Sequence, residues 1–184
     1  MSQDKELLRN IRCGDTDALR QIYEKYKEDL FTVAVSLLGD VHTAEDCLGD
    51  VFTGLADVKG RFNILHNLKG YLTSCVANRA RDYQRKKARE LDCPLEELSC
   101  LAITNDPARE VIDREQLGRI FEALAQLPYQ QREVFVLRVQ GKMKFREIAE
   151  LLNASIKTVQ SRYSYAIEKL RVLLEEKEST HEIK

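Results

Sequence analysis

The side chains best suited to a chemical task lie near the C-terminal end of the chain. Val159, Tyr163 and Ala166 recur at helical spacing and would bury one face of a helix that begins near residue 156. The side chains left facing outward are Lys157, Thr158, Gln160, Ser161, Arg162, Ser164 and Tyr165. Amides and hydroxyls pair with base edges, while lysine and arginine neutralise phosphates. The pattern therefore favours noncovalent reading of DNA.

A shorter helix over 144–152 precedes this one and carries its own apolar stripe, with the small Ala149 near its centre. Between the two helices, Asn153 tolerates the left-handed conformation and Ser155 can cap the second helix. A small residue at a helix crossing lets two helices approach closely, as in a helix-turn-helix that offers its second helix to a DNA groove. An ordinary helical hairpin would show the same pattern.

Charge is strongly segregated along the chain, although the net charge is only −1. Residues 59–89 carry a net charge of +8, and the flanking segments 1–58 and 90–113 each carry −6. Such asymmetry indicates partners rather than fold. The basic block suits a polyanion, and the acidic segments suit a basic protein.

The residues that serve most enzymes are sparse and scattered. The three histidines, His42, His66 and His181, lie in separate contexts, with no HExxH motif and no glycine-rich phosphate loop. Cys93 and Cys100 are seven residues apart, which is not the short spacing of zinc sites. Unliganded thiols are favoured over a metal or redox sensor completed by His66. We expect no catalytic residue, no cofactor and no metal.

Few helix breakers interrupt the 184 residues, since the chain has only 8 glycines and 3 prolines, with 43% hydrophobic and 32% charged residues. Apolar periodicity predicts helices and no strands. The predicted helices span about 5–12, 15–38, 41–56, 67–90, 107–127, 128–140, 144–152 and 156–176, with a loop at 57–67 and an acidic linker from residue 91. We therefore expect an all-α fold of two small helical domains joined by a flexible linker.

The first residues are charged, and no apolar run approaches the roughly 20 residues of a membrane span. We expect a cytoplasmic protein without membrane insertion.

From Leu7 to Leu174, the chain resembles bacterial RNA polymerase sigma factors of the compact, extracytoplasmic-function (ECF) type. Family region 2 is matched by the motifs 14–15, 38–40, 44–46, 50–52, 71–72 and 75–79. Region 4 is matched by the motifs 127–128, 132–134, 147–152 and 158–162. No single motif is diagnostic, but both sets occur in order across a linker of suitable length.

The resemblance implies region 2 at 1–90, a linker at 91–110, region 4 at 111–176 and a tail at 177–184. It implies a noncatalytic factor that binds core RNA polymerase and promoter DNA, both duplex and single-stranded, with an anti-sigma factor as a regulatory partner. The implied polymerase contacts are Asp46, Asp50, Val51 and Phe52. The implied contacts with the minus-ten element are Lys59, Arg61, Phe62, Asn63, Asn78, Arg81, Arg85 and Lys86. The helix-turn-helix residues named above would read the minus-thirty-five element.

Alternatives remain at this level. The chain could be a helix-turn-helix regulator that works without polymerase, or a degenerate sigma-like protein that only binds a partner. Among single residues, Phe52 is expected in the core, Phe62 could pack under its loop, and Arg79 could pair with Asp82 three residues on.

Overall fold

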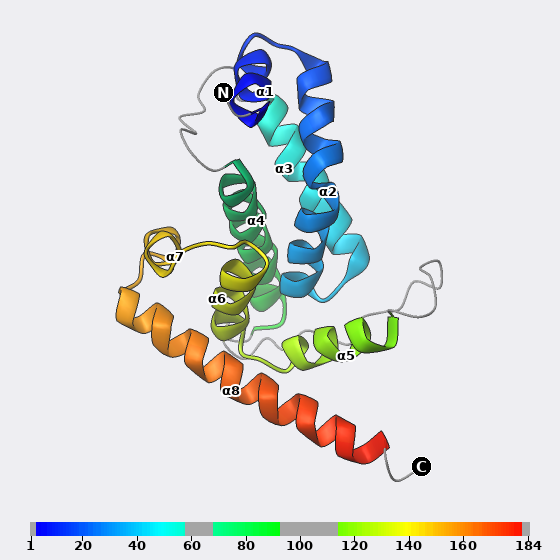
Figure 1. Ribbon diagram of the computed structural model, residues 1–184, viewed down its shortest axis with the longest axis vertical. Helices are drawn as coiled ribbons and strands as arrows, with labels where there is room; N and C mark the ends of the chain where they lie inside the picture. Colours follow the sequence, from blue (N-terminus) through cyan, green and yellow to red (C-terminus); the bar gives the residue numbers. More distant parts are fainter. Residues whose placement is uncertain (1–2, 58–67, 93–113, 182–184) are drawn as a thin grey trace.

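The computed structural model describes residues 3–57, 68–92 and 114–181, which form eight helices and no strand (Figure 1). The first four are α1 (Gln3–Arg12), α2 (Thr16–Leu38), α3 (Val41–Asp57) and α4 (Leu68–Glu90). The other four are α5 (Arg114–Ala125), α6 (Tyr129–Val139), α7 (Phe145–Leu152) and α8 (Ile156–His181). The all-α prediction is confirmed. Most of the expected loop and linker lies outside the described residues.

Local sequence sets where the first helices begin and end. Asp15 caps α2, because its Oδ1 accepts the backbone N–H groups of Asp17 at 2.9 Å and Ala18 at 3.2 Å. Gly39 ends α2 in the left-handed conformation, with φ of 72°, where a side chain would be strained. Asp40 then accepts the N–H of Thr43 at 2.7 Å and starts α3. These short signals turn the chain sharply between α2 and α3.

The first bundle is built around α2, which packs against α1, α3 and α4. Ile22, Leu30 and Leu37 of α2 are fully buried, as are Leu72 and Val76 of α4. Burying this much apolar surface is the main stabilising contribution to such a bundle.

Cys47 of α3 lies inside the first bundle, with its Sγ 3.8 Å from the carbonyl oxygen of Val76. Burial raises the pKa of its thiol to about 12.

The second bundle is organised by α8, which contacts α5, α6 and α7. Its core includes Leu124, Leu127, Ala166 and Leu170. Helix α8 extends to His181, past its expected end near residue 176, because the segment after Leu174 is rich in glutamate and lysine and contains no glycine or proline.

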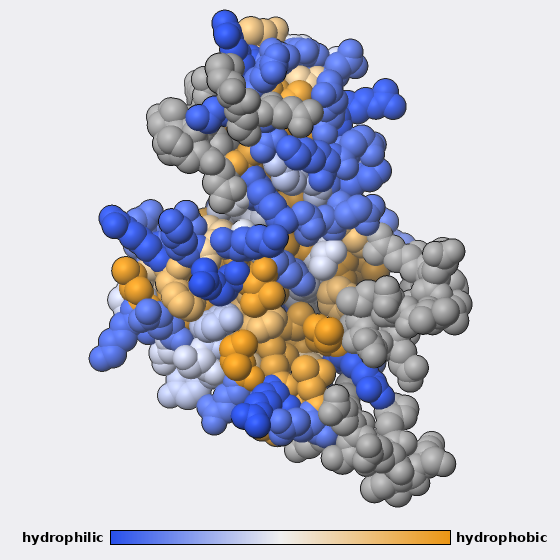
Figure 2. Space-filling model, in the orientation of Figure 1, coloured by the Kyte–Doolittle hydropathy of each residue, from blue (hydrophilic) through white to orange (hydrophobic). Residues whose placement is uncertain are grey.

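The two bundles are in direct contact, which the sequence did not predict. Helix α6 packs against both α2 and α4 (Figure 1). Val134, Leu137 and Ile148 belong to the same buried cluster as Leu37 and Leu72 of the first bundle. In Figure 2, apolar surface gathers over the half of the molecule that holds α5, α6 and α8, whereas the other half is mostly hydrophilic.

Candidate nucleic-acid interface

The turn between α7 and α8 has the geometry that its residue types predict. Asn153 adopts the left-handed conformation, with φ of 49° and ψ of 47°. The hydroxyl of Ser155 accepts the N–H of Thr158 at 3.0 Å and caps α8. At the start of α7, the Glu147 carboxylate accepts the backbone N–H of Lys144 at 2.6 Å. Local hydrogen bonds therefore fix the start of α7 and the start of α8, and Asn153 sets the turn between them.

Packing holds the first half of α8 against α6 and α7. Val159 of α8 and Ile148 of α7 are fully buried. The Tyr163 ring stacks on Phe135 of α6 with centroids 6.2 Å apart and meets Phe145 of α7 edge-on at 5.4 Å. The face of α8 opposite these contacts is thereby presented outward.

That outward face carries the side chains that the sequence predicts. The exposed residues are Lys157, Thr158, Gln160, Ser161, Ser164 and Tyr165. Arg162 differs from them because it is half-buried. Its positive charge is close enough to Glu133 of α6 to lower the pKa of that carboxyl. Polar, amide and basic groups on one rigid helix face suit a DNA groove.

Helix α4 presents a second basic face. Asn78 is exposed, and the side chains of Arg85 and Lys86 are 56% and 77% exposed. Arg85 lies 4.0 Å from Asp82, and Lys86 lies 4.0 Å from Glu90, so both pairs are loose. Arg85 and Lys86 are therefore available to bind the phosphate backbone of a nucleic acid. Four other candidates, Lys59, Arg61, Phe62 and Asn63, lie outside the described residues.

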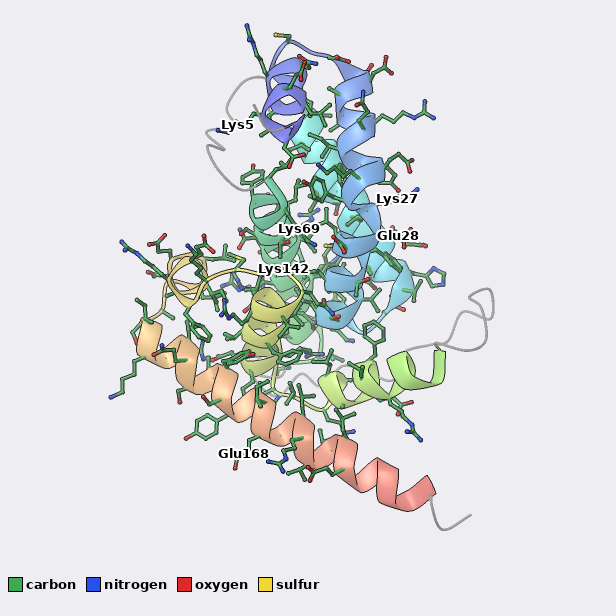
Figure 3. All side chains as sticks on the ribbon, viewed as in Figure 1. Lys5, Lys27, Glu28, Lys69, Lys142 and Glu168 are labelled. Carbon is green, nitrogen blue, oxygen red and sulfur yellow. The ribbon has the colours of Figure 1, made fainter. Side chains whose placement is uncertain are left out.

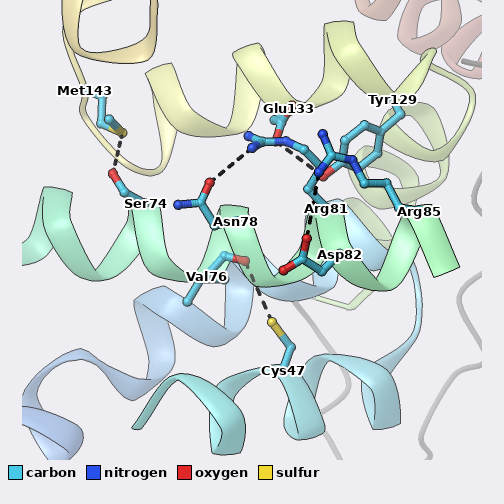
Figure 4. Close-up of polar contacts among 10 residues, drawn as sticks. All are labelled: Cys47, Ser74, Val76, Asn78, Arg81, Asp82, Arg85, Tyr129, Glu133 and Met143. Atoms are coloured by element: carbon cyan, nitrogen blue, oxygen red, sulfur yellow. Dashed lines mark hydrogen bonds and ion pairs between the residues drawn. The ribbon is translucent and has the colours of Figure 1, made fainter. Parts of the chain in front are cut away.

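Arg81 does not share this exposure, although the sequence placed it with Arg85 and Lys86. Its side chain is 16% exposed, and its Nη2 lies 2.7 Å from Oε1 of Glu133 on α6 (Figure 4). Its Nε donates to the same oxygen at 3.1 Å, and its Nη1 donates to Asn78 at 3.1 Å. Arg81 therefore joins the two bundles.

Glu133 is the residue that sequence reasoning missed. Its side chain is 5% exposed, and Tyr129 donates a hydroxyl hydrogen bond to it at 3.4 Å. Burial raises the pKa of Glu133, and the Arg81 guanidinium only partly offsets that rise. The signal in the sequence was that Glu133 is the only acidic residue of α6 and directly precedes the apolar run at 134–137.

The acidic face of α3 holds the proposed polymerase contacts. Asp50 Oδ2 accepts hydrogen bonds from Nη2 and Nε of Arg79, at 2.6 and 2.9 Å, and from the Tyr83 hydroxyl at 2.9 Å. The hydrogen bonds from Arg79 and then Tyr83 lower the pKa of this carboxyl below its usual range. The suggested pairing of Arg79 with Asp82 is therefore wrong, because Arg79 reaches across to α3 instead.

The other candidates on α3 differ in availability. Asp46 is exposed, and among the described residues no hydrogen bond or ion pair engages its carboxylate. Val51 is half-buried. Phe52 is buried and meets the ring of Tyr23 edge-on at 5.0 Å, as expected of a core residue. Asp46 is thus the side chain best placed for a partner.

Within residues 3–57, 68–92 and 114–181, no group of three metal-ligating side chains comes together. Cys93, Cys100 and His66 lie outside those ranges. No described helix is long and apolar enough to cross a membrane.

Comparison with known proteins gives two family matches along the chain. The Sigma-70 region 2 family matches residues 22–90, and the Sigma-70 region 4 family matches residues 117–170. The region 2 match covers most of α2 and all of α3 and α4, and the region 4 match runs from α5 to the middle of α8 and includes the helix-turn-helix.

Whole-chain relatives are also sigma factors. The chain is 27% identical to the ECF RNA polymerase sigma factor SigW of Bacillus subtilis, over 91% of this chain and 94% of that protein. It is 28% identical to the RNA polymerase sigma factor NccH of Alcaligenes xylosoxydans, over 95% and 96% of the two chains.

A solved structure of the sigma factor RpoE with the anti-sigma factor NepR, from Bartonella quintana, matches with a TM-score of 0.68 and 25% identity, over 85% of this chain and 96% of that chain. The structure of CnrH with the cytosolic domain of CnrY has the same fold, with a TM-score of 0.66 at 24% identity, over 94% of this chain and 97% of that chain.

Proposed function

Since this chain belongs to the sigma-70 family, as an ECF sigma factor that directs transcription initiation, we propose a division of labour among its helices. Helix α3 docks on core RNA polymerase, α4 with the loop before it holds the melted minus-ten strand, and α8 reads the minus-thirty-five duplex. The observation that carries the proposal is the exposed polar and basic face of α8 in a rigid helix-turn-helix, on the same chain as the basic α4. In this proposal the chain catalyses no reaction itself. Core RNA polymerase carries out RNA synthesis, and both proteins act in the cytoplasm.

The acidic exposed side of α3 suits a polymerase surface rich in arginine and lysine. Asp46→Arg should lower the affinity for bacterial core RNA polymerase at least tenfold, because it places like charges opposite each other. Gel-filtration co-elution measures this change in affinity. Asp46 is the sharper probe, because Asp50→Arg would also break the hydrogen bonds with Arg79 and Tyr83.

The matched control is Glu6→Arg, an equal charge change at an exposed position of α1. It should leave co-elution unchanged. If Asp46→Arg co-elutes like wild type, docking through α3 is wrong. If the wild-type chain binds DNA but never co-elutes, it acts as a regulator without polymerase.

The exposed cations of α4 give a second test. Replacing Arg85 and Lys86 with alanine should reduce the slope of log affinity against log salt by about 1.4, because two phosphates of the single strand are no longer neutralised. The probe is a fluorescein-labelled, random-sequence single-stranded DNA, followed by anisotropy at several salt concentrations. Lys5→Ala with Arg9→Ala removes the same charge from α1, which Figure 3 shows well away from the end of α4, and should leave the slope unchanged. An unchanged slope in the α4 variant refutes the assignment.

An anti-sigma factor is proposed as the regulatory partner. Of the two structurally similar sigma factors, RpoE was solved with the anti-sigma factor NepR and CnrH with the cytosolic domain of CnrY. Exposed apolar side chains on α5 and α8, including Ile120, Ile167 and Val172, provide apolar surface for a protein partner.

A further inference from the structure

The carboxylate of Asp50 on α3 is held by two side chains of α4, which packs alongside α3 (Figure 1). The hydrogen bonds converge on one oxygen, because Oδ2 accepts Nη2 and Nε of Arg79 at 2.6 and 2.9 Å and the Tyr83 hydroxyl at 2.9 Å. The Arg79 guanidinium also lies over the Tyr83 ring, 5.5 Å from its centroid. Asp50, Arg79 and Tyr83 therefore form one network that joins α3 to α4.

This network leaves Asp50 able to bind a partner. The Asp50 side chain is 40% exposed, and among the described residues no hydrogen bond or ion pair engages its Oδ1. An ionised carboxylate offers about four acceptor sites on its two oxygens. Oδ1 can therefore accept a hydrogen bond from an arginine or lysine of a partner while Oδ2 stays bound to Arg79 and Tyr83.

Asp46 provides the contrast on the same face of α3, since residues four positions apart on a helix are neighbours. Burial and the hydrogen bond to Asp50 raise the pKa of Tyr83, and the nearby charge of Asp46 adds to that rise. Asp46 has no hydrogen bond of its own to fix it. A free side chain must be immobilised when a partner binds, whereas Asp50 is immobilised beforehand, and this preorganisation lowers the entropic cost of docking.

Holding α3 against α4 is the other role that this network could have. Apolar packing already performs that task, because Leu48 of α3 lies in the same buried cluster as Val76 and Ala80 of α4. The ion pair between Arg79 and Asp50 is 45% and 40% exposed on its two sides, and pairs this exposed contribute little to stability. The network therefore serves the orientation of Asp50 more than the fold.

We propose that Arg79 and Tyr83 are positioning residues for docking on core RNA polymerase. They fix the Asp50 carboxylate so that its Oδ1 receives a basic side chain of the polymerase. This inference rests on the proposed function, because it takes α3 as the docking helix. The docking surface then depends on α4 as well as α3, through two side chains that act by way of Asp50.

The test measures the affinity of the full chain for bacterial core RNA polymerase, without DNA, by the anisotropy of a fluorescent label at the N-terminus. Arg79→Ala should weaken binding about threefold to tenfold, which is the cost of immobilising one mobile side chain at an interface. Tyr83→Phe removes only the hydroxyl and should weaken binding by a smaller factor. Arg89→Ala removes the same charge from an exposed position of α4 and should leave the affinity unchanged.

A double-mutant cycle separates positioning from other effects. Because Arg79 acts through Asp50, Arg79→Ala should cause no further loss of affinity in a chain that already carries Asp50→Ala. Urea unfolding should be nearly the same for Arg79→Ala and wild type. Tighter or unchanged binding by Arg79→Ala overturns the inference, as does an equal loss with and without Asp50. Either result leaves the proposed function standing if Asp46→Arg still weakens docking. If Asp46→Arg also binds like wild type, docking through α3 is itself wrong.

Discussion

Leu72→Ala is expected to lower the free energy of unfolding by about 2–5 kcal/mol. Leu72 is 0% exposed on α4, within the cluster that also holds Leu37 and Val76. Truncation removes apolar packing and leaves a cavity that the surrounding helices cannot fully close. Urea unfolding followed by helical circular dichroism measures the change. Because α4 carries the proposed single-strand contacts, a destabilisation of that size would also weaken promoter melting.

Leu91→Ala is the matched control for this substitution. Leu91 follows the end of α4 and is 58% exposed, so the same side chain is removed without opening a cavity. Its effect should stay within about 0.5 kcal/mol. Equal destabilisation by both variants would show that the buried cluster around Leu72 is not the stabilising core.

Gln160→Ala combined with Ser161→Ala is expected to reduce discrimination among duplex sequences, by about tenfold or more for each base that is no longer read. A well-formed hydrogen-bonded pairing with a base edge contributes about 1–3 kcal/mol of discrimination. Both side chains are exposed on α8, so their removal should leave the fold intact. The measurement is sequencing of a random duplex pool retained by the complex with core polymerase. Enrichment at the upstream element should flatten while polymerase binding persists.

Lys157→Ala provides the comparison for these two residues. Lys157 is exposed in the first turn of α8. Its ammonium group can neutralise a phosphate, but it lacks the paired hydrogen-bond donor and acceptor with which an amide recognises a base edge. Its removal should weaken binding to all duplexes alike and reduce the salt dependence. If the Gln160 and Ser161 variant behaves in the same way, those residues bind the DNA backbone and not the bases.

The elements that could be predicted from the sequence are those set by neighbouring residues. Asp15, Gly39 and Asn153 mark helix ends through side chains or backbone conformations that act within a few positions. The exposed face of α8 likewise follows from the spacing of Val159 and its apolar partners. Apolar periodicity and helix-capping residues were enough to predict these helix ends and this exposed face.

The ion pairs could not be predicted in this way. Arg79 was assigned to Asp82 by its spacing of three, yet it pairs with Asp50, 29 positions earlier. Arg81 was grouped with the exposed cations of α4, yet Glu133 lies 52 positions away in sequence and 2.7 Å away in space. A long flexible cation binds whichever carboxylate the packing brings near, and that choice depends on how the helices pack together.

The buried thiol of Cys47 gives this fold a built-in reporter of its own opening. Burial raises the pKa of this thiol to about 12, so very little of it is thiolate at neutral pH, and the side chain is also enclosed by the bundle. A thiol reagent in solution therefore reaches Cys47 only when α2, α3 and α4 separate. The rate of its modification, set against that of the exposed Cys13, measures how often the first bundle opens under native conditions.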